Sequence, residues 1–164
     1  MAFDLKLRPN AIPWPPLIYA IACVCGVLLE RFVPTGVLLP RWLVLGGRAL
    51  MALGLGLDFW AMATMFLART NIFPHRAARR LVTTGPFAFT RNPIYLGNTV
   101  LMLGIGLAWD ALWFLPLAFS AAFLVERLAI RREEAHLDLR FGPEWASYAT
   151  KSPRWLKWPG RGRG

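Results

Sequence analysis

The sequence predicts an all-α integral membrane helical bundle of about four transmembrane helices, followed by a C-terminal amphipathic helix on the cytoplasmic side. Hydrophobic residues make up 56% of the 164 residues, whereas the apolar share of soluble domains is about 45–50%. The mean hydropathy is +0.42. Eight Trp and eleven Phe supply bulky side chains suited to lipid and its interfaces. Together with recurring apolar runs, these observations favour a membrane protein.

The apolar runs define the expected helices, because a spanning helix needs about 20 mostly apolar residues. The first run begins at two prolines, and proline is well tolerated at a helix start. The second is longer than a span requires. The third and fourth are short and only Asp110 separates them, which predicts a tight helical hairpin. The predicted spans are residues 15–32, 42–67, 94–109 and 111–130, within one domain covering 1–164.

Basic residues predict the orientation, since Lys and Arg next to apolar runs are held in cytoplasmic loops. The net charge is +10, and five arginines but no acidic residue lie between Asp58 and Asp110. We therefore expect a multi-pass protein with both termini in the cytoplasm, and with loop 70–93 and tail 131–164 on that side. The basic residues adjoin apolar runs and the RGRG end is short, so nucleic acid is not an expected partner.

Other kinds of site find little support in the sequence. Cys23 and Cys25 would point about 200° apart on a helix, so they are expected to be apolar filler. His75 and His136 are too few for a metal site, and no Gly-x-Gly-x-x-Gly follows a strand. Asp58 lies inside the second run, where a carboxylate should face protein or water. Helix packing and a ligand site both remain open for it.

Two polar stretches flank the predicted hairpin. "TRNPIYLG" places Arg91, Asn92 and Tyr95 at the entrance of the third run, and Glu133 and Glu134 follow the fourth run. Because the hairpin is short, both stretches should lie at one membrane border and meet there. Taken alone, each residue has another explanation. The arginine could set the membrane orientation, the tyrosine could lie at the membrane interface, and the glutamates could be on a solvated helix face. Their combination indicates a polar binding site.

The pairing of "GPFAFTRNPIY" with "EEAHLDLRFGPEWASY" resembles the isoprenylcysteine carboxyl methyltransferase and phospholipid N-methyltransferase superfamily of integral membrane enzymes. The resemblance covers roughly residues 70–155. It implies S-adenosyl-L-methionine as the cofactor and S-adenosyl-L-homocysteine as its product. It also implies a lipid or lipid-like acceptor, such as an isoprenylcysteine-type carboxylate or a phospholipid headgroup amine. The sequence leaves the identity of the acceptor open, and small thiols or amines remain alternatives. The alternative is a non-catalytic membrane scaffold or lipid-binding protein of the same fold.

The resemblance also implies a set of site residues. Arg91, Pro93 and Tyr95 match an Arg-His-Pro-x-Tyr pattern, with Asn92 in place of the His of carboxyl methyltransferases. Phe87 stands where the cofactor-covering loop usually has Tyr, and a Gly-x-Gly of the phospholipid branch corresponds to "GLG" in the second run. The implied cofactor-binding residues are Gly54, Gly56, Gly85, Phe87, Asn92, Pro93, Tyr95, Glu133 and Glu134.

The chemistry of these side chains suits that cofactor. Arg91 can hold a carboxylate or phosphate in bidentate fashion, and a glutamate can accept from a ribose hydroxyl or an ammonium. The ring of Tyr95 can face a cation, worth about 0.5–2 kcal/mol. Arg91 and Glu133 are the predicted catalytic residues: Glu133 as the base for an amine acceptor, Arg91 as the clamp for a carboxylate. Membrane lipids are expected partners, no metal is expected, and no oligomeric state is predicted.

Overall fold

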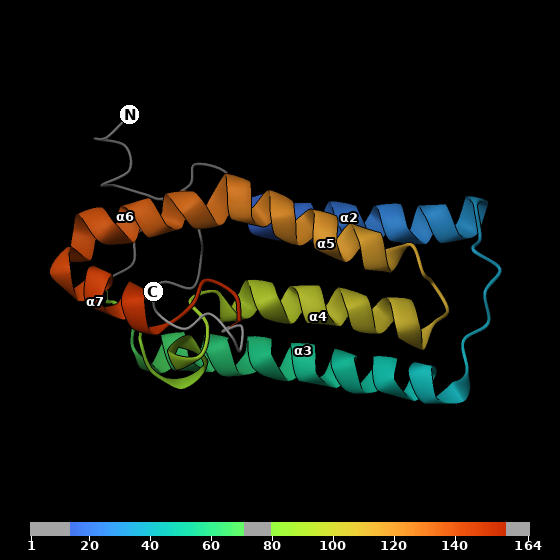
Figure 1. Cartoon of the computed structure of the whole chain (residues 1–164), viewed down its shortest axis with the longest axis horizontal. Helices are drawn as coiled ribbons and strands as arrows, with labels where there is room; N and C mark the ends of the chain where they lie inside the picture. Colours follow the sequence, from blue (N-terminus) through green and yellow to red (C-terminus); the bar gives the residue numbers. More distant parts are fainter. Residues whose placement is uncertain (1–13, 71–79, 157–164) are drawn as a thin grey trace, which may run out of the picture.

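The computed structural model describes residues 14–70 and 80–156. These residues form an elongated bundle in which four helical runs lie side by side and two helices extend beyond one end (Figure 1). Within the described ranges there is no strand. The elements are α2 (Trp14–Phe32), α3 (Arg41–Leu67), η1 (Gly85–Ala88), α4 (Pro93–Ala108), α5 (Phe114–Val125), η2 (Glu126–Ile130), α6 (Arg131–Phe141) and α7 (Pro143–Lys151).

The all-helical prediction is confirmed for these ranges, and α2, α3 and α4 begin and end close to the first three predicted spans. The helical run that begins with α5 continues past residue 130, the predicted end of the fourth span, to Phe141. Two of them, α2 and α3, are long and apolar enough to cross a membrane. The apolar helices α4 and α5 are shorter, with 16 and 12 residues. The count of four spans and the cytoplasmic orientation therefore stay predictions. The residues 6, 8, 75, 76 and 79 and the RGRG end, which entered the sequence argument, lie outside the described residues.

Proline and glycine set the helix boundaries near the charged end of the bundle. Pro93 is the first residue of α4, where its fixed φ suits a helix start and its missing N–H costs no helical bond. Gly142 ends α6 with a φ of +50°, a conformation that glycine adopts without steric cost. Pro143 then begins α7. A Gly-Pro pair is a typical signal for the end of one helix and the start of the next, and it acts as one here.

Glycines allow α3 and α4 to pack closely along their length. A Cβ atom at Gly54 would meet the carbonyl oxygen of Gly97, and one at Gly47 would meet the carbonyl oxygen of Gly104. Each helix thus places two glycines seven residues apart, on one face, toward the other helix. We call these four residues the glycine seam. The seam fixes the position of α4, whose first turn carries Pro93.

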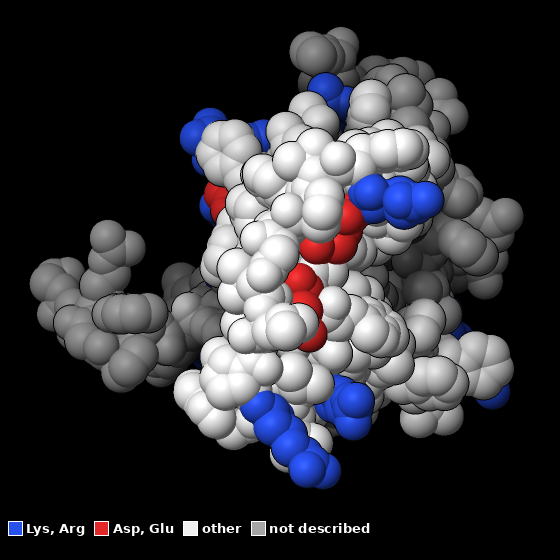
Figure 2. Space-filling view, turned by 90° about the vertical axis from the view of Figure 1, so that its right-hand side faces the viewer, with Lys and Arg blue, Asp and Glu red and all other residues white. Residues whose placement is uncertain are grey.

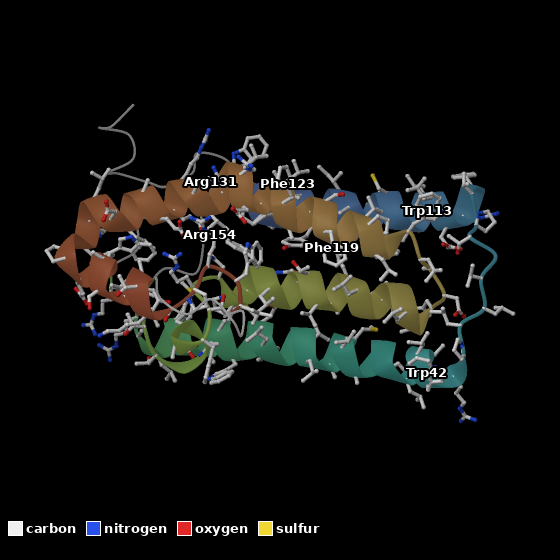
Figure 3. The ribbon with its side chains drawn as sticks, viewed as in Figure 1. Trp42, Trp113, Phe119, Phe123, Arg131 and Arg154 are labelled. Carbon is white, nitrogen blue, oxygen red and sulfur yellow. The ribbon has the colours of Figure 1, made fainter. Side chains whose placement is uncertain are left out.

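The other side of α4 faces α2 and α5 through an apolar core. Buried members of this core include Ile18, Ala22, Phe114 and Ala118. In contrast, many large apolar side chains on the outer faces are exposed, among them Phe119 and Phe123 of α5 (Figure 3). A surface of this kind favours contact with lipid over contact with water.

Helices α5 and α6 form one continuous helical run through η2, which is a π-helical turn. This run passes beyond the end of the bundle, where α6 lies, and α7 turns back toward the start of α4 (Figure 1). As a result, the residues that follow α7 return to the loop that precedes α4.

Candidate functional site

Three segments meet at one end of the bundle, which we call the site end. They are the loop 85–93, the helix α6, and residues 152–155, which we call the C-terminal strap. The opposite end carries loop 33–40 and the turn between α4 and α5. The two ends lie at the two extremes of the long axis (Figure 1).

Arg91 is held at the centre of this meeting point. Its backbone N–H donates to the carbonyl of Pro153 at 2.8 Å. Its Nη2 lies 3.3 Å from Oε1 of Glu134, and only 15% of its side chain is exposed. The guanidinium carbon stands 5.5 Å from the centre of the Trp145 ring. Its Nε is buried and has no hydrogen-bond partner among the described residues. Arg91 is therefore a positioned cation with one buried N–H that no described residue accepts.

The first turn of α4 contacts the other glutamate of the pair. The Tyr95 hydroxyl donates to Oε1 of Glu133 at 2.8 Å. At its other end, the carbonyl of Tyr95 accepts a hydrogen bond of 2.9 Å from the Tyr19 hydroxyl of α2. The "TRNPIYLG" stretch and the glutamate pair thus meet, as the short hairpin predicts. Glu133 and Glu134 bind different partners, Tyr95 and Arg91.

Asn92 binds the C-terminal strap in this structure. Its Nδ2 donates to the carbonyl of Arg154 at 2.9 Å, and the hydroxyl of Thr90 donates to the same oxygen at 3.1 Å. The Asn92 side chain is buried. Its amide therefore anchors backbone, next to Pro93 at the start of α4. A cofactor-binding role for these two residues stays a prediction.

Gly85 and Phe87 lie in η1, against the end of α3. Gly85 has a φ of +60°, and a Cβ atom there would press on Oγ1 of Thr64, so both conformation and space favour glycine. The carbonyl of Phe87 accepts a 2.7 Å hydrogen bond from the Tyr148 hydroxyl. Burial raises the pKa of Tyr148 to about 12, so this phenol stays protonated and donates at neutral pH. Helix α7 therefore holds η1 in place.

The two glycines of the "GLG" stretch have different surroundings. Gly54 belongs to the glycine seam, whereas a side chain at Gly56 would meet nothing within 4 Å in the described structure. Among the described contacts, none joins either glycine to Arg91 or to the glutamate pair. Their assignment to the cofactor stays a prediction, and the close approach of α4 already explains Gly54.

The structure adds three residues that the sequence argument did not assign to the site. Nε of Arg154 donates to Oε1 of Glu134 at 3.0 Å, and its Nη2 binds the other oxygen of that carboxylate. Its Nη1 donates to Glu126 at 3.1 Å, and the indole N–H of Trp155 donates to the same carboxylate at 2.9 Å. Figure 3 shows Arg154 between α6 and α4.

Hydrogen bonding to Glu134 raises the pKa of Arg154 above its ordinary value, so its guanidinium is charged throughout the physiological range. The sequence signal for these contacts was weak: a Pro-Arg-Trp that follows a short helix. The contacts depend on the turn of the chain at Gly142, which lets residues 152–155 return to the loop before α4.

These features define a class of protein: an apolar helical bundle of membrane type with a charged site at one end, closed by its own C-terminal strap. The sequence pattern of the phospholipid methyltransferase family matches residues 42–144, which run from α3 to the start of α7. The chain belongs to this phospholipid methyltransferase family. The resemblance drawn from the sequence is thereby confirmed.

Three curated proteins illustrate the similarity. The nickel-cobalt-cadmium resistance protein NccN of Alcaligenes xylosoxydans xylosoxydans is 36% identical over 78 residues, which are 48% of this chain and 36% of that protein. The cobalt-zinc-cadmium resistance protein CzcN of Cupriavidus metallidurans is 35% identical over 78 residues, with the same coverage of 48% and 36%. The Delta(14)-sterol reductase LBR of Gallus gallus is 30% identical over 90 residues, or 53% of this chain and 14% of that protein. The chain thus matches only about a third of each bacterial relative.

Proposed function

We propose that this protein is an integral membrane methyltransferase that transfers a methyl group from S-adenosyl-L-methionine to a lipid or lipid-like acceptor at the cytoplasmic membrane face. Membership of the phospholipid methyltransferase family supports methyl transfer. The exposed apolar faces of the bundle support an acceptor that arrives from lipid. One observation carries the proposal: Arg91 and Tyr95, at the start of α4, meet Glu134 and Glu133 of α6.

The donor set at the site end fits the proposed cofactor. When bound, S-adenosyl-L-methionine supplies an activated methyl group on a sulfonium. Arg91 would hold a carboxylate, because its buried Nε has no partner among the described residues and guanidinium matches carboxylate geometry. Glu133 would accept from a ribose hydroxyl or an ammonium. The ring of Tyr95, fixed through its hydroxyl and its carbonyl, would offer its face to a cation.

The residues of the chain then have two tasks in the reaction. The first is alignment of acceptor and methyl group, which can supply about 7–11 kcal/mol of the barrier. The second depends on the acceptor. An amine nitrogen must lose a proton, and Glu133 is the proposed base, positioned by the Tyr95 hydroxyl. A carboxylate acceptor needs no base, and Arg91 would then orient it.

The names of the relatives suggest other activities, namely resistance to metals and sterol reduction. In residues 14–70 and 80–156, no three His, Cys, Asp or Glu side chains gather in a group suited to a metal ion. The proposal therefore takes from these relatives only the shared segment, and it depends on the arginine–glutamate site.

Isothermal titration of the detergent-solubilised protein tests the proposal. We expect saturable binding of S-adenosyl-L-methionine that S-adenosyl-L-homocysteine displaces. Reduced nicotinamide adenine dinucleotide phosphate serves as the comparison ligand. A protein with the activity named for the sterol reductase relative would need such a hydride donor. Membranes incubated with methyl-labelled cofactor would then show the label in the lipid or protein fraction by mass spectrometry. A scaffold or lipid-binding protein would bind neither S-adenosyl-L-methionine nor the nicotinamide cofactor, and that result would refute the proposal.

A further inference from the structure

Arg91 and Arg154 share one carboxylate, that of Glu134, and they share it unequally. Arg154 grips both carboxylate oxygens, one through Nε at 3.0 Å and the other through Nη2. Arg91 approaches only Oε1, through Nη2 at 3.3 Å, and this is the oxygen that Nε of Arg154 already binds. A bidentate arginine–carboxylate pair is the stronger arrangement. Glu134 is therefore mainly the partner of Arg154.

This unequal sharing matters because Arg91 and Glu134 are both largely buried. Their side chains are 15% and 16% exposed, so little solvent screens the attraction between them. Without a competing cation, a carboxylate at this distance would draw the Arg91 guanidinium into a bidentate pair of its own. The donors of Arg91 would then be occupied, including the Nε that now has no partner among the described residues.

We propose that Arg154 is a positioning residue that engages Glu134 and thereby keeps the Arg91 guanidinium available for the oxyanion of a bound ligand. This inference rests on the proposed function, since the ligand is either the cofactor carboxylate or the phosphate of a lipid headgroup. Both offer oxygen atoms on a planar or tetrahedral anion that an arginine binds through paired hydrogen bonds.

The backbone around Arg154 is fixed relative to Arg91. The carbonyl of Arg154 accepts hydrogen bonds from Thr90 and Asn92, the two neighbours of Arg91 in sequence. The preceding carbonyl, of Pro153, accepts the Arg91 N–H. The two guanidinium groups therefore start from adjacent, hydrogen-bonded stretches of backbone and reach the same carboxylate.

A simpler role for Arg154 would be to fasten the C-terminal strap to the bundle, through Glu126 as well as Glu134. The two roles make different predictions. If Arg154 only fastens the strap, every hydrogen bond between the strap and the bundle contributes. Removing Glu134 as well as Arg154 should then lower ligand affinity and stability further. Keeping Arg91 available depends on the charge of Glu134, so removing that charge should compensate for the loss of Arg154.

The test compares full-length wild-type protein in detergent with Arg154→Ala, Arg154→Lys and the double variant Arg154→Ala/Glu134→Gln. Arg131→Ala is the matched control, because Arg131 contacts Glu126 at 3.6 Å and is half exposed. The readouts are the dissociation constant of S-adenosyl-L-homocysteine and the thermal unfolding temperature. 5′-Methylthioadenosine, which lacks the amino-acid carboxylate, separates oxyanion binding from nucleoside binding. A second comparison tests for binding of a lipid phosphate. It measures how much phosphatidic acid raises the unfolding temperature relative to diacylglycerol, which lacks the phosphate.

For a cofactor carboxylate, we expect Arg154→Ala to weaken S-adenosyl-L-homocysteine binding by about tenfold, the effect of losing one charge-assisted hydrogen bond. Arg154→Lys should fall between wild type and alanine, because it keeps the charge without the fork. The double variant should recover to within about threefold of wild type, and 5′-methylthioadenosine should bind all variants alike. For a lipid phosphate, the same loss and recovery should appear in the stabilisation by phosphatidic acid.

Two results would overturn the inference. In the first, Arg154→Ala leaves both oxyanion responses at the wild-type level. In the second, the double variant binds no better than Arg154→Ala, which would mean that Glu134 binds the cofactor itself or that Arg154 only fastens the strap. Failure of the wild-type protein to bind S-adenosyl-L-homocysteine would instead refute the proposed function, and this inference with it.

Discussion

The two ends of the bundle both contain carboxylates, but they use them differently. At the opposite end, Glu30 accepts from the backbone N–H and the hydroxyl of Thr35, at 3.2 and 3.4 Å. Asp110 accepts from the backbone N–H of Leu39 at 2.9 Å. Figure 2 faces this end and shows acidic groups near its centre, with basic side chains toward the edge. These acids close loops by accepting from loop backbone N–H groups and, in the case of Glu30, also from the hydroxyl of the same threonine.

At the site end, the carboxylates bind side chains from distant segments. Glu134 binds Arg91 and Arg154, and Glu133 binds the Tyr95 hydroxyl. Partly buried charges are costly to desolvate, and a fold that only needs to close a loop can use backbone partners, as the opposite end does. The site end therefore contains partly buried ion pairs that closing a loop would not require. This difference supports the site end as the functional end of the bundle.

The largest expected effect concerns the glycine seam, which serves both ends. Gly47→Leu and Gly54→Leu should each lower the free energy of unfolding by about 3 kcal/mol, because the added side chain meets α4 backbone. Gly56→Leu is the matched control, since its side chain would enter open space. Thermal unfolding in detergent measures all three. If Gly54→Leu were as stable as Gly56→Leu, the claim that Gly54 is needed for close packing of α3 and α4 would be wrong. If a stable Gly56→Leu protein lost cofactor binding, that result would support the predicted role of Gly56.

The second prediction compares one arginine from each end. Arg91→Ala should reduce methyl transfer by about a hundredfold, or about 2.7 kcal/mol of transition-state free energy, because a positioned charge is lost. Arg41→Ala, which removes an exposed arginine at the start of α3, should leave the rate unchanged. Turnover of methyl-labelled cofactor is the measurement. Equal rates in the two variants would remove the distinction between the ends.

The third prediction concerns the loop-closing acid of the opposite end. Asp110→Ala should lower the free energy of unfolding by about 2 kcal/mol, because the Leu39 N–H loses its acceptor and alanine tolerates the positive φ poorly. Asp110→Asn keeps an acceptor oxygen and suits that backbone, so it should be close to wild type. S-adenosyl-L-homocysteine should bind both variants normally. Weaker binding in Asp110→Ala alone would show that the ends are coupled.

The smallest expected effect belongs to an exposed charge at the site end. Arg131 lies 3.6 Å from Glu126 and its side chain is 49% exposed. Such a pair contributes under about 0.5 kcal/mol in most cases, so Arg131→Ala should change neither stability nor turnover measurably. Chemical denaturation and the labelling assay provide the check. A large loss of stability or turnover would mean that an arginine contributes through its place among the charged residues of the site end, and not through its burial.

Much of the fold could be predicted because the apolar runs are long and their boundaries carry clear signals. Pro93 begins α4 and Gly142 ends α6, as expected from the conformations that these residues favour. The meeting of Arg91 with Glu134 could also be predicted, because α4 and α5 are joined by a turn too short to separate them.

The remaining contacts depend on side-chain directions that sequence periodicity does not encode. Gly54 and Gly56 are two residues apart and point about 200° away from each other on a helix, so both could not face α4. The return of Arg154 depends on how sharply the chain bends at Gly142, and a charge pattern says nothing about that angle. Glu126 lies inside the predicted span 111–130, and its hydrogen bonds to Arg154 and Trp155 appear only when the C-terminal strap returns.

The π-helical turn between α5 and α6 determines which way the acids face. In a regular α-helix, Glu134 would point about 80° away from Glu126 around the axis. The wide turn Glu126–Ile130 takes up an additional residue, so both carboxylates reach the single guanidinium of Arg154. If this turn tightened into ordinary helix, α6 would rotate like a screw and move its acidic edge away from Arg91. The π-helical turn at the end of the bundle thus keeps Glu126 and Glu134 on the same side of the helical run, where both contact Arg154.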